Sequence, residues 1–347
     1  MNIKKAIETL TELPSVSGYE HLLHDRIFSL CEGVFDTAYA LKNQSVVAVK
    51  KCGNPNAPVI LLNAHLDEIG MYVTAVHEGG FLSVTNIGGI DTNILYASQV
   101  TVYGKRPIKG VFVSTPPHLG NGSTDLDKIT KLVIDTGLTK KELDELVDIG
   151  TPAVLANGVD YLLNDRISSR GLDDKIGVIT IIKAVEMLKK TIDFDIYALF
   201  SSQEEVTSLG ASTGVYDINP DMAIVVDVGH AKMKGIDEIG ALELSCGTAV
   251  SYSATTSRKL SDAICTTAEK HKLKFRRVSE ANNTGTDAHN IQVALEGIPC
   301  TVLSVPLRNM HTACEVISLE DVKNTSKLIA CFITDGLYRG EEMRIIG

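Results

Sequence analysis

The feature that most constrains the fold is a regular alternation of strand-like and helix-like segments after Asp173. Strands are predicted at residues 196–200, 223–226, 275–278 and 300–305, and helices at 176–188, 259–271, 287–295 and 319–337. The helix at 176–188 is apolar almost all round, as a buried helix is. This alternation indicates the α/β class, with a mostly parallel sheet flanked by helices on both faces.

The same pattern of predicted strands and helices occurs before residue 70. Strands are predicted at 45–49 and 59–63, and the second is continuously apolar, as a strand buried on both faces would be. Ser17, with Glu20 three positions on, has the form of a helix N-cap, and a helix is expected from there to about Ser29. We therefore expect residues 1–69 and 160–347 to form one α/β domain.

The intervening segment, residues 70–159, differs in composition. Glycines are frequent, and the strand-like runs, such as 99–103 and 110–114, are short. Pro116, Pro117 and His118, followed by a turn at Gly120–Gly122, interrupt these runs, and one helix is predicted at 140–146. The pattern predicts a small β-rich domain inserted into the α/β domain.

Composition excludes several classes of partner. The net charge is −10, from 33 basic and 43 acidic residues, whereas nucleic-acid-binding surfaces are usually basic. No apolar run reaches the roughly 18 residues that cross a bilayer, and the N-terminus does not resemble a signal peptide, so no membrane association is expected. The seven cysteines include no C-x-x-C pair, which argues against a disulfide framework and favours the reducing cytoplasm.

Residue types that bind metals follow the predicted strands, or open a buried helix, at five places. These are His65 with Asp67, Asp173 with Asp174, Glu204 with Glu205, Asp227, and His311. Taken singly, each has a simpler explanation, such as a helix cap, a turn, a solvated loop or a structural histidine. Ligands in open α/β sheets gather at the carboxyl ends of strands, so the five places can converge.

Together, these residues offer the nitrogen and oxygen donors that suit Zn²⁺, Co²⁺ or Mn²⁺. Two such ions roughly 3.5–4 Å apart form a hydrolytic device. This device needs a bridging carboxylate and an unligated acid or base. Glu204 and Glu205 could divide the tasks of base and ligand, and Asp67 could fix the tautomer of the His65 imidazole.

The motifs around these residues resemble those of the M42 metallo-aminopeptidases, a cytosolic group that includes glutamyl and deblocking aminopeptidases. They occur in the family's order at residues 65–70, 172–177, 203–206, 285–288 and 306–311. The resemblance implies a two-metal aminopeptidase that releases N-terminal residues from peptides. It also implies a zinc-peptidase-like catalytic domain and a PDZ-like insertion that mediates assembly into homo-oligomers, up to a dodecamer.

The resemblance further implies a role for each site residue. His65 and Asp227 would bind one ion, Glu205 and His311 would bind the other, and Asp173 would bridge the two. Glu204 would be the general base, and Asp67 would orient His65. Gly229 and Thr248 depart from the family's usual pattern, which leaves the preferred N-terminal residue open.

Two other readings remain open. The chain could be a glycosidase that uses Glu204 and Glu205 as its carboxylate pair, although it has no Trp and only 5% aromatic residues to form sugar platforms. It could also be a non-catalytic assembly protein of the same fold. That reading predicts no turnover of aminoacyl substrates with any divalent metal.

Overall fold

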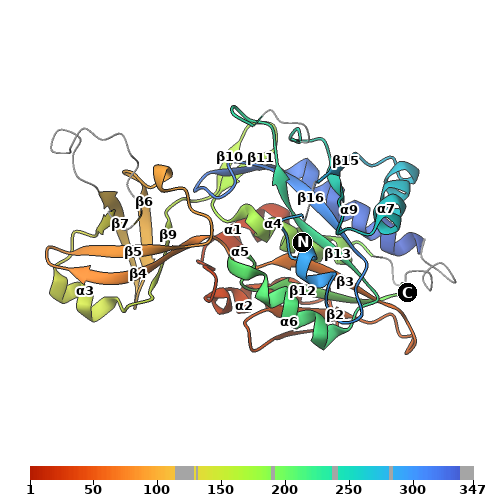
Figure 1. Ribbon diagram of the computed structural model, residues 1–347, viewed down its shortest axis with the longest axis horizontal. Coiled ribbons are helices and arrows are strands. Elements are labelled where there is room, and N and C mark those ends of the chain that lie inside the picture. The colour runs from red at the N-terminus through yellow and green to blue at the C-terminus, as the bar shows by residue number, and fades with distance from the viewer. Residues whose placement is uncertain (114–128, 130–131, 189–191, 237–240, 281–283, 337–347) are drawn as a thin grey trace.

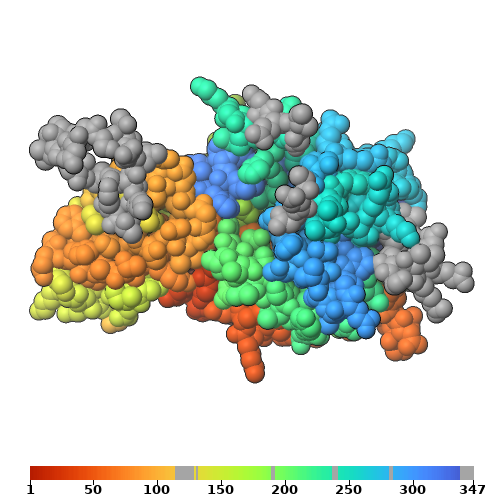
Figure 2. Space-filling model, in the orientation of Figure 1, coloured from red at the N-terminus to blue at the C-terminus, as the bar shows by residue number. Residues whose placement is uncertain are grey.

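The computed structural model describes residues 1–113, 129, 132–188, 192–236, 241–280 and 284–336 (Figure 1). These residues form an α/β body and a smaller β-barrel, which projects from the body as a separate lobe (Figures 1 and 2). The proline-rich segment around Pro116 and the turn at Gly120–Gly122 lie outside the described residues.

Eleven strands among the described residues form the sheet of the body. Their order is β1 (Thr37–Ala40), β2 (Val46–Lys50), β12 (Asp195–Ser201), β3 (Val59–His65), β13 (Met222–His230), β16 (Cys300–Arg308), β17 (Glu315–Ser318), β11 (Arg166–Ser169) and β10 (Asp160–Leu162). The remaining two, β14 (Thr248–Tyr252) and β15 (Phe275–Ser279), branch from β16.

The sheet is mixed rather than mostly parallel. Strands β12, β3, β13 and β16 run parallel in its centre, and β14 is parallel to β15. The pairs at both edges, and β14 with β16, are antiparallel. Short connections such as those from β1 to β2 and from β16 to β17 permit only antiparallel pairing, because a parallel pair needs a long crossover.

Helices cover both faces of this sheet. One face carries α1 (Ile3–Thr11), α4 (Leu172–Glu186), α7 (Arg258–Lys270) and α9 (Leu319–Asp335), and the other carries α6 (Leu209–Ile218) and α8 (Ala288–Ile291). Along β3, Ile60 and Leu62 pack toward α4, and Leu61 packs toward α6. This burial on both sides accounts for the continuously apolar sequence of β3.

The predicted helices at 176–188, 259–271 and 319–337 are confirmed as α4, α7 and α9, whereas the one at 287–295 is only the four-residue α8. The predicted cap at Ser17 is wrong. A 3₁₀ turn, Glu20–Leu23, precedes α2 (His24–Cys31), and the residue before that turn, Tyr19, makes no side-chain cap hydrogen bond. The Ser17 hydroxyl is instead a donor to Asp67.

The barrel closes in the order β4 (Gly70–His77), β5 (Phe81–Ile87), β8 (Val133–Asp135), β7 (Pro107–Val113), β6 (Gln99–Tyr103) and β9 (Pro152–Leu155). Helix α3 (Lys140–Leu146) begins at Thr139 with a capping box completed by Glu142. Val73, Val102 and Phe112 belong to an apolar core that is distinct from the core of the body. The barrel therefore has its own hydrophobic interior.

No helix within the described residues combines the length and the apolar character needed to cross a bilayer. No disulfide is found in the described part of the chain, which includes all seven cysteines.

Candidate metal centre

The predicted site residues gather where the parallel strands end. His65 is the last residue of β3, and it lies opposite Ser201, the last residue of β12. The other site residues follow or flank these strands: Glu204 and Glu205 open α5 (Glu204–Thr207), Asp227 lies in β13, Asp173 lies at the start of α4, and His311 follows β16. The structure thus brings together all the residue positions proposed from the five motifs.

Asp173 lies between two imidazoles. Its Oδ1 is 3.1 Å from Nε2 of His65, and its Oδ2 is 3.4 Å from Nε2 of His311. Nε2 of His311 is also 3.3 Å from Oε1 of Glu205. One carboxylate that directs each of its oxygens toward a different potential ligand has the arrangement of a bridging group.

Two overlapping sets of side chains could each hold an ion. The ligand atoms of His65, Asp173 and Glu205 lie within 4.8 Å of one another, as do those of His65, Asp174 and Asp227. Asp174 was not among the predicted ligands. It caps α4 by accepting the N–H of Gly177 at 3.0 Å through Oδ1, while its buried Oδ2 has no hydrogen-bond partner.

Asp67 has a wider role than the predicted one. Nδ1 of His65 is 2.9 Å from the Asp67 backbone carbonyl oxygen and 3.6 Å from its carboxylate. The carboxylate accepts the N–H of Glu204 at 3.0 Å, the N–H of Glu205 at 3.2 Å, and the hydroxyl of Ser17 at 2.6 Å. Asp67 therefore positions the turn that carries both glutamates, in addition to contacting His65.

Burial and mutual repulsion dominate the electrostatics of the cluster. Burial and the neighbouring carboxylates raise the pKa of Glu204 to about 9 and that of Asp227 to about 8. Hydrogen bonds to Asp173 and Glu205 raise the pKa of His311 to about 11. Burial alone would raise the pKa of Asp173, but the two imidazoles outweigh it and hold that pKa below its ordinary range.

The donor set fits divalent cations. The cluster buries more carboxylates than the two imidazoles can neutralise, and buried charge is stable only when paired or bound to metal. Oδ2 of Asp174 accepts no hydrogen bond from the protein, so it is free to serve as a metal ligand. Imidazole nitrogens and carboxylate oxygens are ligands of Zn²⁺, Co²⁺ and Mn²⁺.

Sequence reasoning missed Glu315, a buried acid at the start of β17. Its Oε2 accepts the N–H groups of Leu172 at 2.7 Å and Asp173 at 3.2 Å, and its Oε1 accepts the N–H of His311 at 3.0 Å. One carboxylate thus joins the backbone of Asp173 to that of His311. The available signal was an acid directly before the apolar pair Val316 and Ile317.

The barrel also reaches the centre. Nδ1 of His311 is 3.1 Å from the carbonyl oxygen of Gly89, in the loop that follows β5. A Cβ atom at Gly89 would lie 3.0 Å from that same nitrogen, and one at Gly88 would lie 3.4 Å from Glu205. The close approach to His311 accounts for glycine at position 89, and a positive φ of 75° accounts for glycine at position 88.

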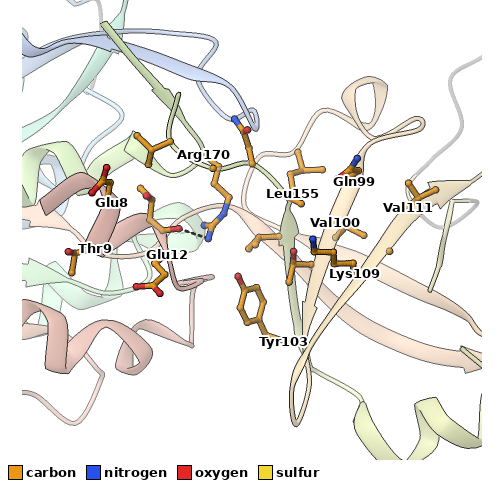
Figure 3. A pocket seen from close by; sticks show the side chains of 18 of the residues that line it. Glu8, Thr9, Glu12, Gln99, Val100, Tyr103, Lys109, Val111, Leu155 and Arg170 are labelled. Atoms are coloured by element: carbon orange, nitrogen blue, oxygen red, sulfur yellow. Dashed lines mark hydrogen bonds between the residues drawn. The ribbon is translucent and has the colours of Figure 1, made fainter. Parts of the chain in front are cut away.

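A cavity of about 720 Å³ opens over the cluster and is bordered by the ends of β13 and β15. A larger hollow of about 1110 Å³ lies at the junction of body and barrel, between α1 and strands β6, β7 and β9. Figure 3 shows Arg170 and Glu12 on its body side and Val100 and Lys109 on its barrel side. None of the predicted site residues lines this larger hollow, so the chemistry belongs to the smaller cavity.

Comparison with known proteins identifies the family of this chain. The family model of the M42 glutamyl aminopeptidases matches residues 45–328. The chain belongs to the M42 peptidase family. It is accordingly a metal-dependent aminopeptidase, and the residue groups around His65 are its candidate metal ligands.

Relatives of this M42 peptidase match it over nearly their whole lengths. A lysyl aminopeptidase of Pyrococcus furiosus is 31% identical over 96% of both chains. The structure of an aminopeptidase from Desulfurococcus kamchatkensis superimposes with a TM-score of 0.91 at 30% identity, covering 99% of this chain and 97% of that one. A Pyrococcus horikoshii peptidase that can assemble into a tetrahedron or a large octahedral shell gives 0.84 at 28% identity, covering 96% and 99%.

Proposed function

We propose that this M42 peptidase removes N-terminal residues from peptides with two divalent ions, held by His65, Asp173, Glu205, Asp227 and His311. The observation that carries the proposal is the placement of the Asp173 carboxylate between the imidazoles of His65 and His311, at 3.1 and 3.4 Å. A shared carboxylate is what keeps two cations close in hydrolytic two-metal sites.

In this proposal His65 and Asp227 hold one ion, and Glu205 and His311 hold the other. Asp174 lies close enough to His65 and Asp227 to support the first ion. Zn²⁺ and Co²⁺ suit these donors, and Mn²⁺ is compatible with them. Metal analysis should find two ions per chain, and Asp173→Asn should lower that number, because an amide is a poorer bridge between cations.

When bound, the ions supply Lewis-acid activation of the water and of the scissile carbonyl group. Glu204 accepts the water proton and passes it to the leaving amine. Its Oε2 is 4.0 Å from Nε2 of His65, at the edge of the cluster. The positive charge of the bound ions would lower the pKa of Glu204 from its raised value, so that the side chain can act as a base near neutral pH.

The test of Glu204 is Glu204→Gln, assayed with an aminoacyl nitroanilide while bound metal is measured in the same preparation. We expect the metal to remain and kcat to fall by about 10²–10⁴-fold, the usual contribution of a general base. Glu32→Gln, at an exposed position after α2, is the control for loss of one negative charge. Full activity in a metal-loaded Glu204→Gln protein would remove Glu204 from the mechanism.

The two alternatives, a glycosidase and a non-catalytic assembly protein, fit this arrangement of residues less well. In a glycosidase Glu204 and Glu205 would flank a sugar, whereas here Glu205 contacts His311 at 3.3 Å and Glu204 lies near His65. Membership of an aminopeptidase family also disfavours a purely structural role. A chelator should abolish hydrolysis in the proposed enzyme and leave a carboxylate-only glycosidase active.

We further propose that residues 70–159 form an inserted PDZ-like domain that mediates homo-oligomer assembly, up to a dodecamer, and that residues 1–69 and 160–347 form the catalytic domain. The separate core of the barrel and the shells formed by the P. horikoshii relative support this assignment. The acidic charge and the absence of disulfides among the described residues suit a cytoplasmic protein without nucleic-acid or membrane partners. Light scattering on the purified chain would measure the subunit number.

A further inference from the structure

The cavity over the metal centre has an uneven distribution of charge. Apart from the centre's own residues, the ionisable side chains that line it within the described residues are His230 and Glu280. No lysine or arginine of the described chain lines it. Away from the metal centre, a substrate side chain that enters this cavity therefore meets one additional carboxylate and no lysine or arginine of the described chain.

Glu280 is held firmly in the cavity wall. It follows β15, and its N–H donates to the carbonyl oxygen of Tyr252 on β14 at 3.0 Å. Its Oε1 accepts the hydroxyl of Ser251, a fully buried residue, at 2.8 Å. The backbone and one carboxylate oxygen of Glu280 are thus hydrogen-bonded to the adjacent strand.

The second oxygen of Glu280, Oε2, is buried and has no hydrogen-bond partner. A buried acceptor without a donor is destabilising, so a donor supplied by a ligand would be favourable. Burial also raises the pKa of Glu280, and a cation nearby would reverse that effect. Oε2 is shielded from solvent, so a ligand would reach it by rotation of the carboxylate group, which leaves the backbone hydrogen bond to Tyr252 in place.

The rest of the cavity wall suits a long aliphatic stem. Leu242, Val278 and Met310 all line it. Lysine and arginine bury their methylene stems against apolar surface while keeping the charged end paired. These apolar residues beside a single carboxylate are complementary to such a side chain, whereas no lysine or arginine of the described lining would pair with an acidic one.

We propose that Glu280 is a specificity-determining residue that binds the positively charged side chain of an N-terminal lysine or arginine of the substrate. The inference rests on the aminopeptidase activity proposed above, and it assigns the substrate class of that same site.

The first test uses the unmodified, metal-loaded protein with nitroanilides of lysine, arginine, norleucine and glutamate. Norleucine matches the lysine stem without its charge. We expect kcat/KM for the lysyl substrate to exceed that for the norleucyl substrate by about 10- to 100-fold, the usual range for a hydrogen bond to a charged group. Equal or better hydrolysis of the norleucyl or glutamyl substrate would overturn the inference, and no hydrolysis of any substrate would instead overturn the proposed function.

The second test changes Glu280. In Glu280→Gln the ratio of kcat/KM for lysyl over norleucyl substrate should fall by about 10- to 100-fold, and Glu280→Lys should shift preference toward the glutamyl substrate. The exposed Glu32→Gln is the control and should leave the ratio unchanged. If Glu280→Gln lowered both substrates equally, the carboxylate would serve the common α-amino group or the fold, and the inference would be wrong.

Discussion

Two buried carboxylates of the centre act on the main chain. Asp67 accepts the backbone N–H groups of Glu204 and Glu205, and Glu315 accepts those of Asp173 and His311. Asp67 therefore fixes the start of α5, and Glu315 joins the start of α4 to the loop that follows β16. Partners of this kind usually contribute 10- to 100-fold to metal affinity or activity.

At this scale we predict that Asp67→Asn weakens the metal site. The replacement amide has one acceptor oxygen in place of two, so it cannot accept both glutamate N–H groups and the Ser17 hydroxyl in the same way. Metal affinity, measured by calorimetry, should fall by about 10- to 100-fold. The exposed Asp25→Asn serves as the control, and unchanged affinity in Asp67→Asn would show that this network is dispensable.

At the scale of elements, the loop that follows β5 connects the barrel to the metal centre. The Gly89 carbonyl oxygen faces Nδ1 of His311 at 3.1 Å and can fix the tautomer that leaves Nε2 free for a metal. We predict that Gly89→Ala displaces His311, because the new Cβ would lie 3.0 Å from Nδ1. Metal affinity should fall about tenfold or more.

The matched control for this change is Gly158→Ala. A Cβ atom there would meet nothing within 4 Å, and neither Gly158 nor Gly89 has a positive φ. The two variants therefore differ in the steric contact with His311 and not in backbone strain. If both variants bound metal as the unmodified protein does, the loop would have no part in orienting His311.

The elements that sequence predicted well are those with a strong apolar pattern, such as β3, β12 and α4. Each ends at or opens onto a proposed ligand, so most of the centre followed from them. Strands β14 and β17 and the antiparallel edges were not predicted, because short or edge strands are fixed by pairing with distant partners. Asp174 was not predicted as a ligand, because the family resemblance implies a role for Asp173 alone in this pair of aspartates.

At the scale of the whole molecule, the buried acids make stability depend on metal and pH together. In the absence of metal the pKa of Glu204 is raised to about 9 and that of Asp227 to about 8, from 4.5 and 3.8. At pH values between the unfolded and the folded pKa of each group, the folded state retains protons that the unfolded state has released. The free energy of unfolding therefore falls as pH rises. His311 acts in the same direction, because its pKa is higher in the folded than in the unfolded chain. Its contribution to stability is complete below the unfolded pKa and is lost as pH rises toward the folded pKa of about 11.

We therefore predict that the chelated protein loses more than about 5 °C in Tm between pH 6 and pH 9. The metal-loaded protein should show a smaller change, because bound ions keep the carboxylates ionised in the fold. Calorimetry of both forms in parallel provides the measurement. Identical pH profiles with and without chelator would indicate that the acids are not balanced by metal.

Assembly is also a property of the whole molecule. The tip of the β10–β11 hairpin exposes Tyr161 by 50%, Leu162 by 46% and Leu163 by 86%, an adjacent apolar group that suits burial between subunits. We predict that Leu163→Asp lowers the mass measured by light scattering. Val293→Asp, at a site 65% exposed on the body, is the control, and an unchanged mass for Leu163→Asp would exclude the hairpin as an interface.

The contact between Gly89 and His311 has a consequence for chimeric enzymes. A barrel transplanted from a related enzyme would need more than compatible junctions near residues 70 and 159. It must also place a backbone carbonyl oxygen within hydrogen-bond distance of Nδ1 of His311. Hybrids that lack this contact should assemble into oligomers yet bind metal weakly. Exchange of the barrel alone would therefore change metal binding as well as the oligomeric state.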